Sequence, residues 1–364
     1  MTLYAFNCII LLRSICEAKQ RADTPVFEVI MDFKDKSKLE RLKQTFSDNF
    51  DITKMYAWYL EHCPEVINAD MIDELTSDGS INVQSAVVAI LSEVFSLDAD
   101  RGAYDRHLIR KYLSPSVRIL DAKRYTENPY YKNIKIPEIR DGRWELKHEC
   151  YPAFRGMICD DMIIRDDFIE VPPLGFFTED FYFPAVLENG NEWMTLTPVD
   201  LDTSEMAIKH AFGKVVTFGL GLGYYAYMVS MKPSVDSITV VEKSEEVIAL
   251  FKKHILPQFP YKDKVRIICA DAFDYAQYEM PAEDYDVAFV DTWRDASDGA
   301  PMYRRMKNLE HLSPSTEFIY WIENFLISRC RAEKYRELIE ALERGAGSDM
   351  SYSDFERAVR YPLD

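Results

Sequence analysis

Three glycines and three carboxylates follow successive apolar segments in the second half of the chain. In order they are Gly219, Gly221, Gly223, Glu242, Asp271 and Asp291. Glycines let a backbone turn tightly and let a ligand approach it, and the N-terminus of a following helix offers unpaired N–H donors. A carboxylate at the position of Glu242, 23 residues after Gly219, can accept hydroxyl protons from a ribose. The pattern predicts a nucleotide site.

The glycine run itself narrows the choice of nucleotide. It reads VVTFGLGLGYY, and the dinucleotide pattern G-x-G-x-x-G needs glycine or alanine where this chain has Tyr224. We therefore expect neither a nicotinamide nor a flavin dinucleotide.

These residues can form one site only if parallel strands bring them to the same edge of a β-sheet. Apolar, β-branched runs predict strands that are buried on both faces. We expect them at 215–218, 238–241, 265–269, 287–290 and 318–322. Asp202 is the expected N-cap of a short helix, 205–212, before the first strand. Because helical patterns alternate with the strands, the expected class is α/β, with ligands outside the carboxyl ends of the strands.

Residues 205–325 resemble the class I S-adenosylmethionine-dependent methyltransferases, which have a Rossmann-like, mostly parallel, doubly wound sheet. The resemblance implies that the three glycines line the methionine part of the cofactor and that Glu242 holds the ribose. It also implies that Asp271 and Ala272 face the adenine and that Asp291 lies beside the methionine amino group or the substrate. Asp291 is then the candidate base for a protonated acceptor, such as an amine. The family has a final antiparallel strand pair, whereas only helix-like sequence follows Phe325 here, so a shortened sheet is expected.

Other functions remain open. The run YDVAFVDTWRD is similar to the aminopropyltransferases of the spermidine synthase type, which use decarboxylated S-adenosylmethionine, although the acids Asp291 and Asp295 are spaced D-x-x-x-D instead of D-x-x-D. Asp295 and Trp293 are candidate substrate contacts. Asp291 with Glu323-Asn324 resembles the cation site of catechol-type methyltransferases, but we expect no metal. A binding protein that has lost turnover is the third alternative.

The length of 364 residues predicts two or three domains. Few glycines and apolar stripes at helical spacing predict a helical domain over residues 1–143, with a connecting loop at 125–143. Alternating patterns predict a small acidic β module at 144–202. The Rossmann-like domain follows at 203–330, and a helical extension at 331–364.

Charge and cysteine content limit the partners and the compartment. A net charge of −18 is the wrong sign for gripping phosphate backbones, so we expect a small-molecule substrate and no nucleic acid. Residues 160–205 contain twelve acids and one base, Arg165, which indicates solvated strand faces or a field that attracts a cationic substrate. Seven cysteines without a CxxC motif predict a reducing, cytoplasmic location. The start, MTLYAFNCIILL, lacks the basic region of a signal peptide, and no segment predicts a membrane span. A homodimer is left open.

Overall fold

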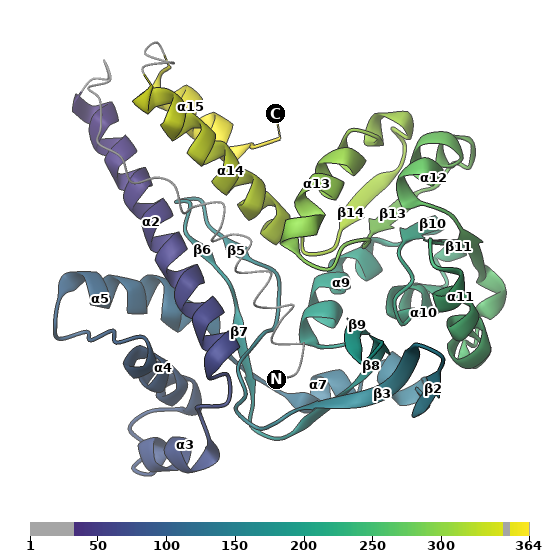
Figure 1. The fold of residues 1–364 in the computed structure, drawn as a ribbon, viewed down its shortest axis with the longest axis horizontal. Helices are drawn as coiled ribbons and strands as arrows, with labels where there is room; N and C mark the ends of the chain where they lie inside the picture. The colour runs from purple at the N-terminus through teal and green to yellow at the C-terminus, as the bar shows by residue number, and fades with distance from the viewer. Residues whose placement is uncertain (1–32, 345–349, 364) are drawn as a thin grey trace.

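The structure, a computed structural model, describes residues 33–344 and 350–363 (Figure 1). Its centre is an all-parallel, five-stranded sheet in the order β12-β11-β10-β13-β14. The strands are β10 (Gly213–Phe218), β11 (Val235–Glu242), β12 (Val265–Cys269), β13 (Val287–Val290) and β14 (Glu317–Tyr320). Along the chain this order is 3-2-1-4-5, which matches the first five strands of the Rossmann order. The predicted parallel α/β sheet is confirmed, and no strand follows β14 within these described ranges.

Helices cover this sheet. In Figure 1, α12 and α13 lie on one side of it, and α9, α10 and α11 lie on the other. Their bounds are α9 (Pro198–His210), α10 (Tyr224–Ser230), α11 (Glu245–Leu250), α12 (Ala272–Tyr278) and α13 (Ala296–Lys307).

Helix α9 begins seven residues before the predicted start at residue 205. Thr197 is its N-cap, and the side chain of Asp200 accepts hydrogen bonds from the backbone N–H and the hydroxyl of Thr197, at 2.7 and 2.8 Å. This capping box sets the start of the helix, so the predicted N-cap at Asp202 is wrong. Asp202 lies inside the helix.

A four-stranded antiparallel sheet accompanies the parallel one, in the order β2-β3-β8-β9. Its strands are β2 (Ile139–Asp141), β3 (Trp144–Tyr151), β8 (Phe181–Glu188) and β9 (Asn191–Thr195). Strands β8 and β9 form a hairpin whose turn, Asn189-Gly190, has positive φ angles of 52° and 78°, as hairpin turns with Asn-Gly require.

Two smaller sheets complete the β structure, and strands β1 and β2 correct the expectation of an all-α segment before residue 144. The strands are β1 (Val117–Leu120), β4 (Met157–Ile158) and β7 (Leu174–Phe177) in one sheet, and β5 (Ile163–Ile164) and β6 (Glu170–Val171) in the other. Strand β1 pairs in parallel with β7, with Val117 opposite Leu174, and β2 pairs with β3. Strands this short carry too little periodicity to be recognised from the sequence.

The helices of the N-terminal half are α2 (Phe33–His62), α3 (Ala69–Thr76), α4 (Val83–Val94), α5 (Ala103–Leu108), α6 (Ser114–Ser116), α7 (Ala122–Thr126) and α8 (Pro129–Asn133). The region predicted as a connecting loop, 125–143, therefore contains the end of α7, all of α8, and β2. Asn128 caps α8 by accepting the N–H of Tyr130, and Pro129 occupies the first turn, where its missing N–H has no consequence. The start of the chain, with the signal-peptide question, lies outside the described residues.

The C-terminal helices α14 (Glu323–Glu343) and α15 (Tyr352–Arg360) pack against α2. A buried ion pair strengthens this region: the Arg331 guanidinium lies 2.7 Å from the Glu170 carboxylate, with side-chain exposures of 6% and 2%. Ser328 donates to the same carboxylate at 2.7 Å. Among the helices described, none combines the length and the apolar character that a membrane crossing needs.

Candidate functional site

The glycine loop lies between β10 and α10, as predicted. Gly219, Gly221 and Gly223 have positive φ angles of 100°, 50° and 75°. A Cβ at Gly219 would lie 1.9 Å from the backbone oxygen of Asp291, and one at Gly223 would lie 2.3 Å from the Phe251 ring. Only glycine therefore fits at these two positions, and the loop is held close to the end of β13.

Glu242 ends β11 beside this loop. Its buried carboxylate accepts the N–H of Leu220 at 3.2 Å and the N–H of Ser244 at 2.8 Å, one on each oxygen. The first bond fixes the glycine loop relative to β11. A carboxylate has about four lone-pair sites, so these two bonds leave capacity for two ribose hydroxyls.

Asp291 follows β13. Its backbone N–H donates a hydrogen bond of 2.9 Å to the carbonyl oxygen of Phe218, the last residue of β10. Loss of solvation raises the pKa of the Asp291 carboxyl most, the negative charges of Asp200 and Glu242 act in the same direction, and together they bring it to about 8. No hydrogen bond or cation from the described part of the chain lowers it. Asp291 is thus a half-buried carboxyl group beside the cavity that, with this pKa, is mostly protonated at neutral pH and that a cationic ligand would ionise.

A small cavity of about 30 Å³ joins these elements. It is lined by the glycine loop, Asp291, and residues of α9 and α10, and also by Met194, Leu196 and Trp321. Its volume holds one or two water molecules. A nucleoside does not fit the site as it stands, so any ligand of that size requires side chains to move.

Asp200 is the site residue that the sequence reasoning missed. It lines the cavity together with Ser204, one helical turn later. Burial raises the pKa of Asp200 to about 6, although the Thr197 hydrogen bonds oppose the shift. The signal that could have found it is the T-P-V-D run, a capping box directly before the first strand.

Tyr225 of α10 lies in the cavity wall. Its ring stacks on Phe289 with centroids 4.4 Å apart, and its hydroxyl is buried without a hydrogen-bond partner among residues 33–344 and 350–363. The charge that acts on this hydroxyl is that of Glu317 at the start of β14, so Tyr225 contributes its ring, and not its hydroxyl, to the cavity wall.

The short helix α8 braces the loop from outside. The Tyr130 hydroxyl donates to the carbonyl of Leu222 at 2.5 Å, and Asn128 donates to the Tyr224 hydroxyl at 3.1 Å. The segment expected to be a plain connection therefore positions the site.

The predicted adenine contacts, Asp271 and Ala272, follow β12 at the start of α12. Asp271 caps α12 by accepting the N–H groups of Phe273 and Asp274, at 2.9 and 3.2 Å. Neither Asp271 nor the buried Ala272 lines the cavity. The end of β12 is thus organised as a helix start.

Trp293 and Asp295 also lie away from the cavity lining. Trp293 is buried against Gly299 and stacks with Tyr320 at 6.3 Å, and Asp295 forms the capping box of α13 with Asp298. This cap explains the D-x-x-x-D spacing, because Asp295 must stand at the N-cap position of α13.

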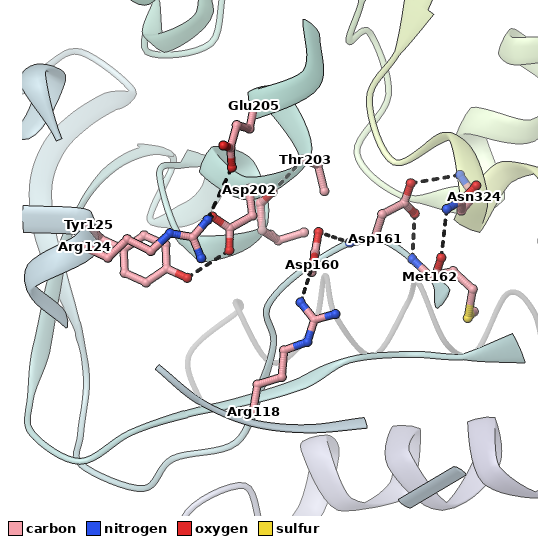
Figure 2. Close-up of polar contacts among 11 residues, drawn as sticks. Arg118, Arg124, Tyr125, Asp160, Asp161, Met162, Asp202, Thr203, Glu205 and Asn324 are labelled. Atoms are coloured by element: carbon pink, nitrogen blue, oxygen red, sulfur yellow. Dashed lines mark hydrogen bonds and ion pairs between the residues drawn. The ribbon is translucent and has the colours of Figure 1, made fainter. Parts of the chain in front are cut away.

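The side chains of Glu323 and Asn324 form hydrogen bonds with other parts of the chain. Glu323 accepts the Tyr303 hydroxyl at 2.6 Å, and the Asn324 side chain donates to the carbonyl of Met162 at 2.9 Å (Figure 2). Within the described ranges, no group of three or more metal-ligating side chains is assembled.

Figure 2 shows what neutralises part of the acidic segment: arginines from a different part of the sequence. Arg118 pairs with Asp160 at 2.6 Å, and Arg124 pairs with Asp202 at 2.7 Å and with Glu205 at 3.4 Å. These two arginines pair with three of the twelve acids of residues 160–205 and so reduce the predicted negative field locally.

The Asp161 side chain, in the same view, accepts hydrogen bonds from the N-terminal end of α14. Its carboxylate accepts the N–H groups of Asn324 and Phe325 at the start of α14, at 2.9 and 3.0 Å (Figure 2). Burial nevertheless raises the pKa of Asp161 to about 7. Asp161 therefore tethers the segment after β4 to α14.

No protein family matches the sequence, and no curated protein matches it. The solved structures that are similar include a spermidine synthase in complex with the transition-state analogue AdoDATO, at 15% identity and a TM-score of 0.28, covering 41% of this chain and 55% of that one. The spermidine synthase from Thermotoga maritima is similar at 16% identity and a TM-score of 0.28, covering 42% and 56%. The chain thus matches little more than half the length of these proteins. Its own strand order, rather than these similarities, defines a Rossmann-like sheet with a glycine loop after its first strand.

Proposed function

We propose that this protein is a transferase that binds an S-adenosylmethionine-type donor at the carboxyl ends of β10, β11 and β13 and transfers its methyl group to an amine. The observation that carries the proposal is the half-buried Asp291 carboxyl group, which lines the cavity beside the glycine loop and whose raised pKa no cation of the described residues opposes. A sulfonium or an ammonium group supplies the positive charge that such a carboxylate needs.

The roles follow from the geometry. Glu242, already bonded to Leu220, would bind the ribose hydroxyls and so couple the donor to the loop. Asp200 and Asp291 would hold positive charge on the other side of the cavity. Oriented binding of donor and acceptor in line supplies much of the rate of such a transfer.

In the proposed reaction, the amine nitrogen forms a bond to the methyl carbon while the bond from that carbon to sulfur breaks. The bonding pair stays on sulfur, which becomes a neutral thioether. The proton lost by the amine passes to the Asp291 carboxylate, which must be ionised beforehand.

Aminopropyl transfer from decarboxylated S-adenosylmethionine is the second candidate, because it would use the same half-buried carboxylate to accept an amine proton. The capping role of Asp295 leaves that reaction without its second free acid. A non-catalytic nucleotide-binding protein is the third candidate.

The experiment that separates these candidates is turnover with a panel of primary and secondary amines, using donor labelled on the methyl group or on the aminopropyl chain. Methyl transfer predicts label in the product only from the first donor, and Asp291→Asn should lower kcat/KM about 100-fold or more, as loss of a general base does. Label transferred only from the aminopropyl donor would contradict the first candidate. Donor binding without turnover for any amine would favour the third.

Glu242→Ala should weaken donor binding without abolishing the fold. Each charge-assisted hydrogen bond to ribose is worth about 1.5–3 kcal/mol, so the dissociation constant should rise at least tenfold. Affinity within twofold of the wild type would make Glu242 a bystander.

A further inference from the structure

The glycine loop is covered by a methionine. A Cβ placed on Gly221 would lie 3.0 Å from Cε and 3.4 Å from Sδ of Met194, so this side chain occupies the space directly above the loop backbone. Met194 comes from β9 of the antiparallel sheet and lines the cavity. The space that a ligand needs in order to reach Gly221 is therefore filled by the protein's own thioether.

A bulge in β9 fixes the direction of Met194. In the β8–β9 pairing, Val186 lies opposite Met194 and Leu187 lies opposite Glu192, which leaves Trp193 as an extra residue. A bulge of this kind bends a strand and changes the direction of its side chains, and such bulges are common beside active sites. The local irregularity thus serves to place Met194 on the loop.

Strand β9 is anchored at its C-terminal end, where Thr195 and Leu196 are buried and the Tyr131 hydroxyl donates to the Leu196 carbonyl at 2.5 Å. The part that can leave this position is therefore its first four residues, 191–194. The whole strand has five residues, lies at the edge of its sheet, and pairs with β8 alone. Releasing an edge strand breaks a single ladder, whereas releasing a central strand breaks two. The preceding turn, Asn189-Gly190, is a tight connection about which the strand can move.

Weak contacts hold the closed position. The Trp193 ring meets Trp144 edge to face at 5.4 Å, and Trp144 Nε1 donates to Glu246 of α11 at 2.9 Å. Arg143 pairs with the same carboxylate, with side-chain exposures of 49% for Arg143 and 55% for Glu246. Exposed ion pairs contribute little, so these contacts form a latch that is easily opened. The latch joins the antiparallel sheet to the helix that begins just after Glu242.

We propose that β9 is a lid with Met194 as its plug: it covers the glycine loop when the site is empty and moves aside to admit the adenosyl donor. The nature of the ligand rests on the proposed function, whereas the covering of the loop does not. Because only the open fraction of molecules binds, the apparent dissociation constant equals the intrinsic one divided by that fraction. Met194 would therefore set the affinity and the rate of donor entry.

Calorimetric titration with S-adenosylmethionine and with its demethylated product tests the lid. Met194→Ala should tighten binding about threefold or more, since it removes the plug and raises the open fraction. Met194→Leu is the matched control: it keeps the apolar volume and should stay within about twofold of the wild type. Weaker or unchanged binding by Met194→Ala would overturn the inference, since Met194 would then contact the donor or play no part.

Amide hydrogen exchange of the full chain without ligand gives a second result, one that does not depend on the donor. Amides of residues 219–223 should exchange faster in Met194→Ala and in Glu246→Gln than in the wild type or Met194→Leu, while those of β13 should not change. Equal rates at the loop in all four proteins would overturn the lid. If no adenosyl compound binds to any variant, the proposed function fails, and the exchange rates still decide whether Met194 covers the loop.

Discussion

The ionisation of Asp291 should be coupled to donor binding. With a pKa of about 8, this carboxyl group is about 90% protonated at pH 7 when the site is empty. An opposite charge within a few ångströms lowers a carboxyl pKa by about 1–3 units. The sulfonium of the donor should therefore bring the pKa to between about 7 and 5, which leaves between about half and one hundredth of the group protonated.

The difference is a release of about 0.4–0.9 proton per donor bound at pH 7. Asp200 contributes little to this number, because a group with a pKa of about 6 is already about 90% ionised at pH 7. The donor's own amino group also titrates near neutral pH, so the informative quantity is the difference between the wild type and Asp291→Asn.

Calorimetric titrations at pH 7 in buffers of low and high ionisation enthalpy measure the proton release from the slope of the observed enthalpy. The wild type should release more protons than Asp291→Asn by the amount given above. Binding with equal slopes for the two proteins would refute the reasoning, because the Asp291 carboxyl would then not face the positive charge.

Other predictions concern pH, the loop and the buried ion pair. If Asp291 is the base, kcat/KM should rise with pH through an apparent pKa of about 8 and level off above it, and a flat profile between pH 6 and 9 would exclude that role. Gly219→Ala should lower the melting temperature far more than Gly142→Ala does, since both glycines have positive φ but only the Cβ at Gly219 would meet a backbone oxygen; equal losses would show that the clash is relieved. Glu170→Ala should reduce the free energy of unfolding by about 3–5 kcal/mol in urea titrations, because it leaves Arg331 buried without its partner, and a loss under 1 kcal/mol would mean that water reaches the guanidinium.

The parallel sheet could be predicted because its signals are local. Strands β12 and β13 have the predicted bounds, because their β-branched, apolar runs alternate regularly with helical patterns, as parallel strands buried on both faces do. The glycine loop and the acids at the ends of β11 and β13 then follow from the order of the elements. This is why Gly219, Glu242 and Asp291 meet as expected.

The cover of the site could not be predicted, because it depends on contacts between distant segments. Met194 reaches Gly221 only through the β8–β9 pairing and its bulge, and Arg118 and Arg124 pair with acids that follow them by 42 and 78 residues in the chain. Asp271 and Asp295 each follow a strand, as a ligand-binding acid does, and each caps a helix in the structure, so their predicted ligand contacts stay predictions. An acid after a strand satisfies either role equally well in sequence.

The central claim is that the glycine loop binds an adenosyl donor. The most direct test is calorimetric titration of the protein with S-adenosylmethionine, its demethylated product, the decarboxylated donor and NAD. The account predicts binding of the intact donor or its product by the wild type and Met194→Ala, no binding of NAD, and loss of binding in Gly221→Val, whose side chain would fill the ligand's approach at a position with a φ of 50°. Absence of heat from all adenosyl compounds with both the wild type and Met194→Ala, or unchanged affinity in Gly221→Val, would contradict it.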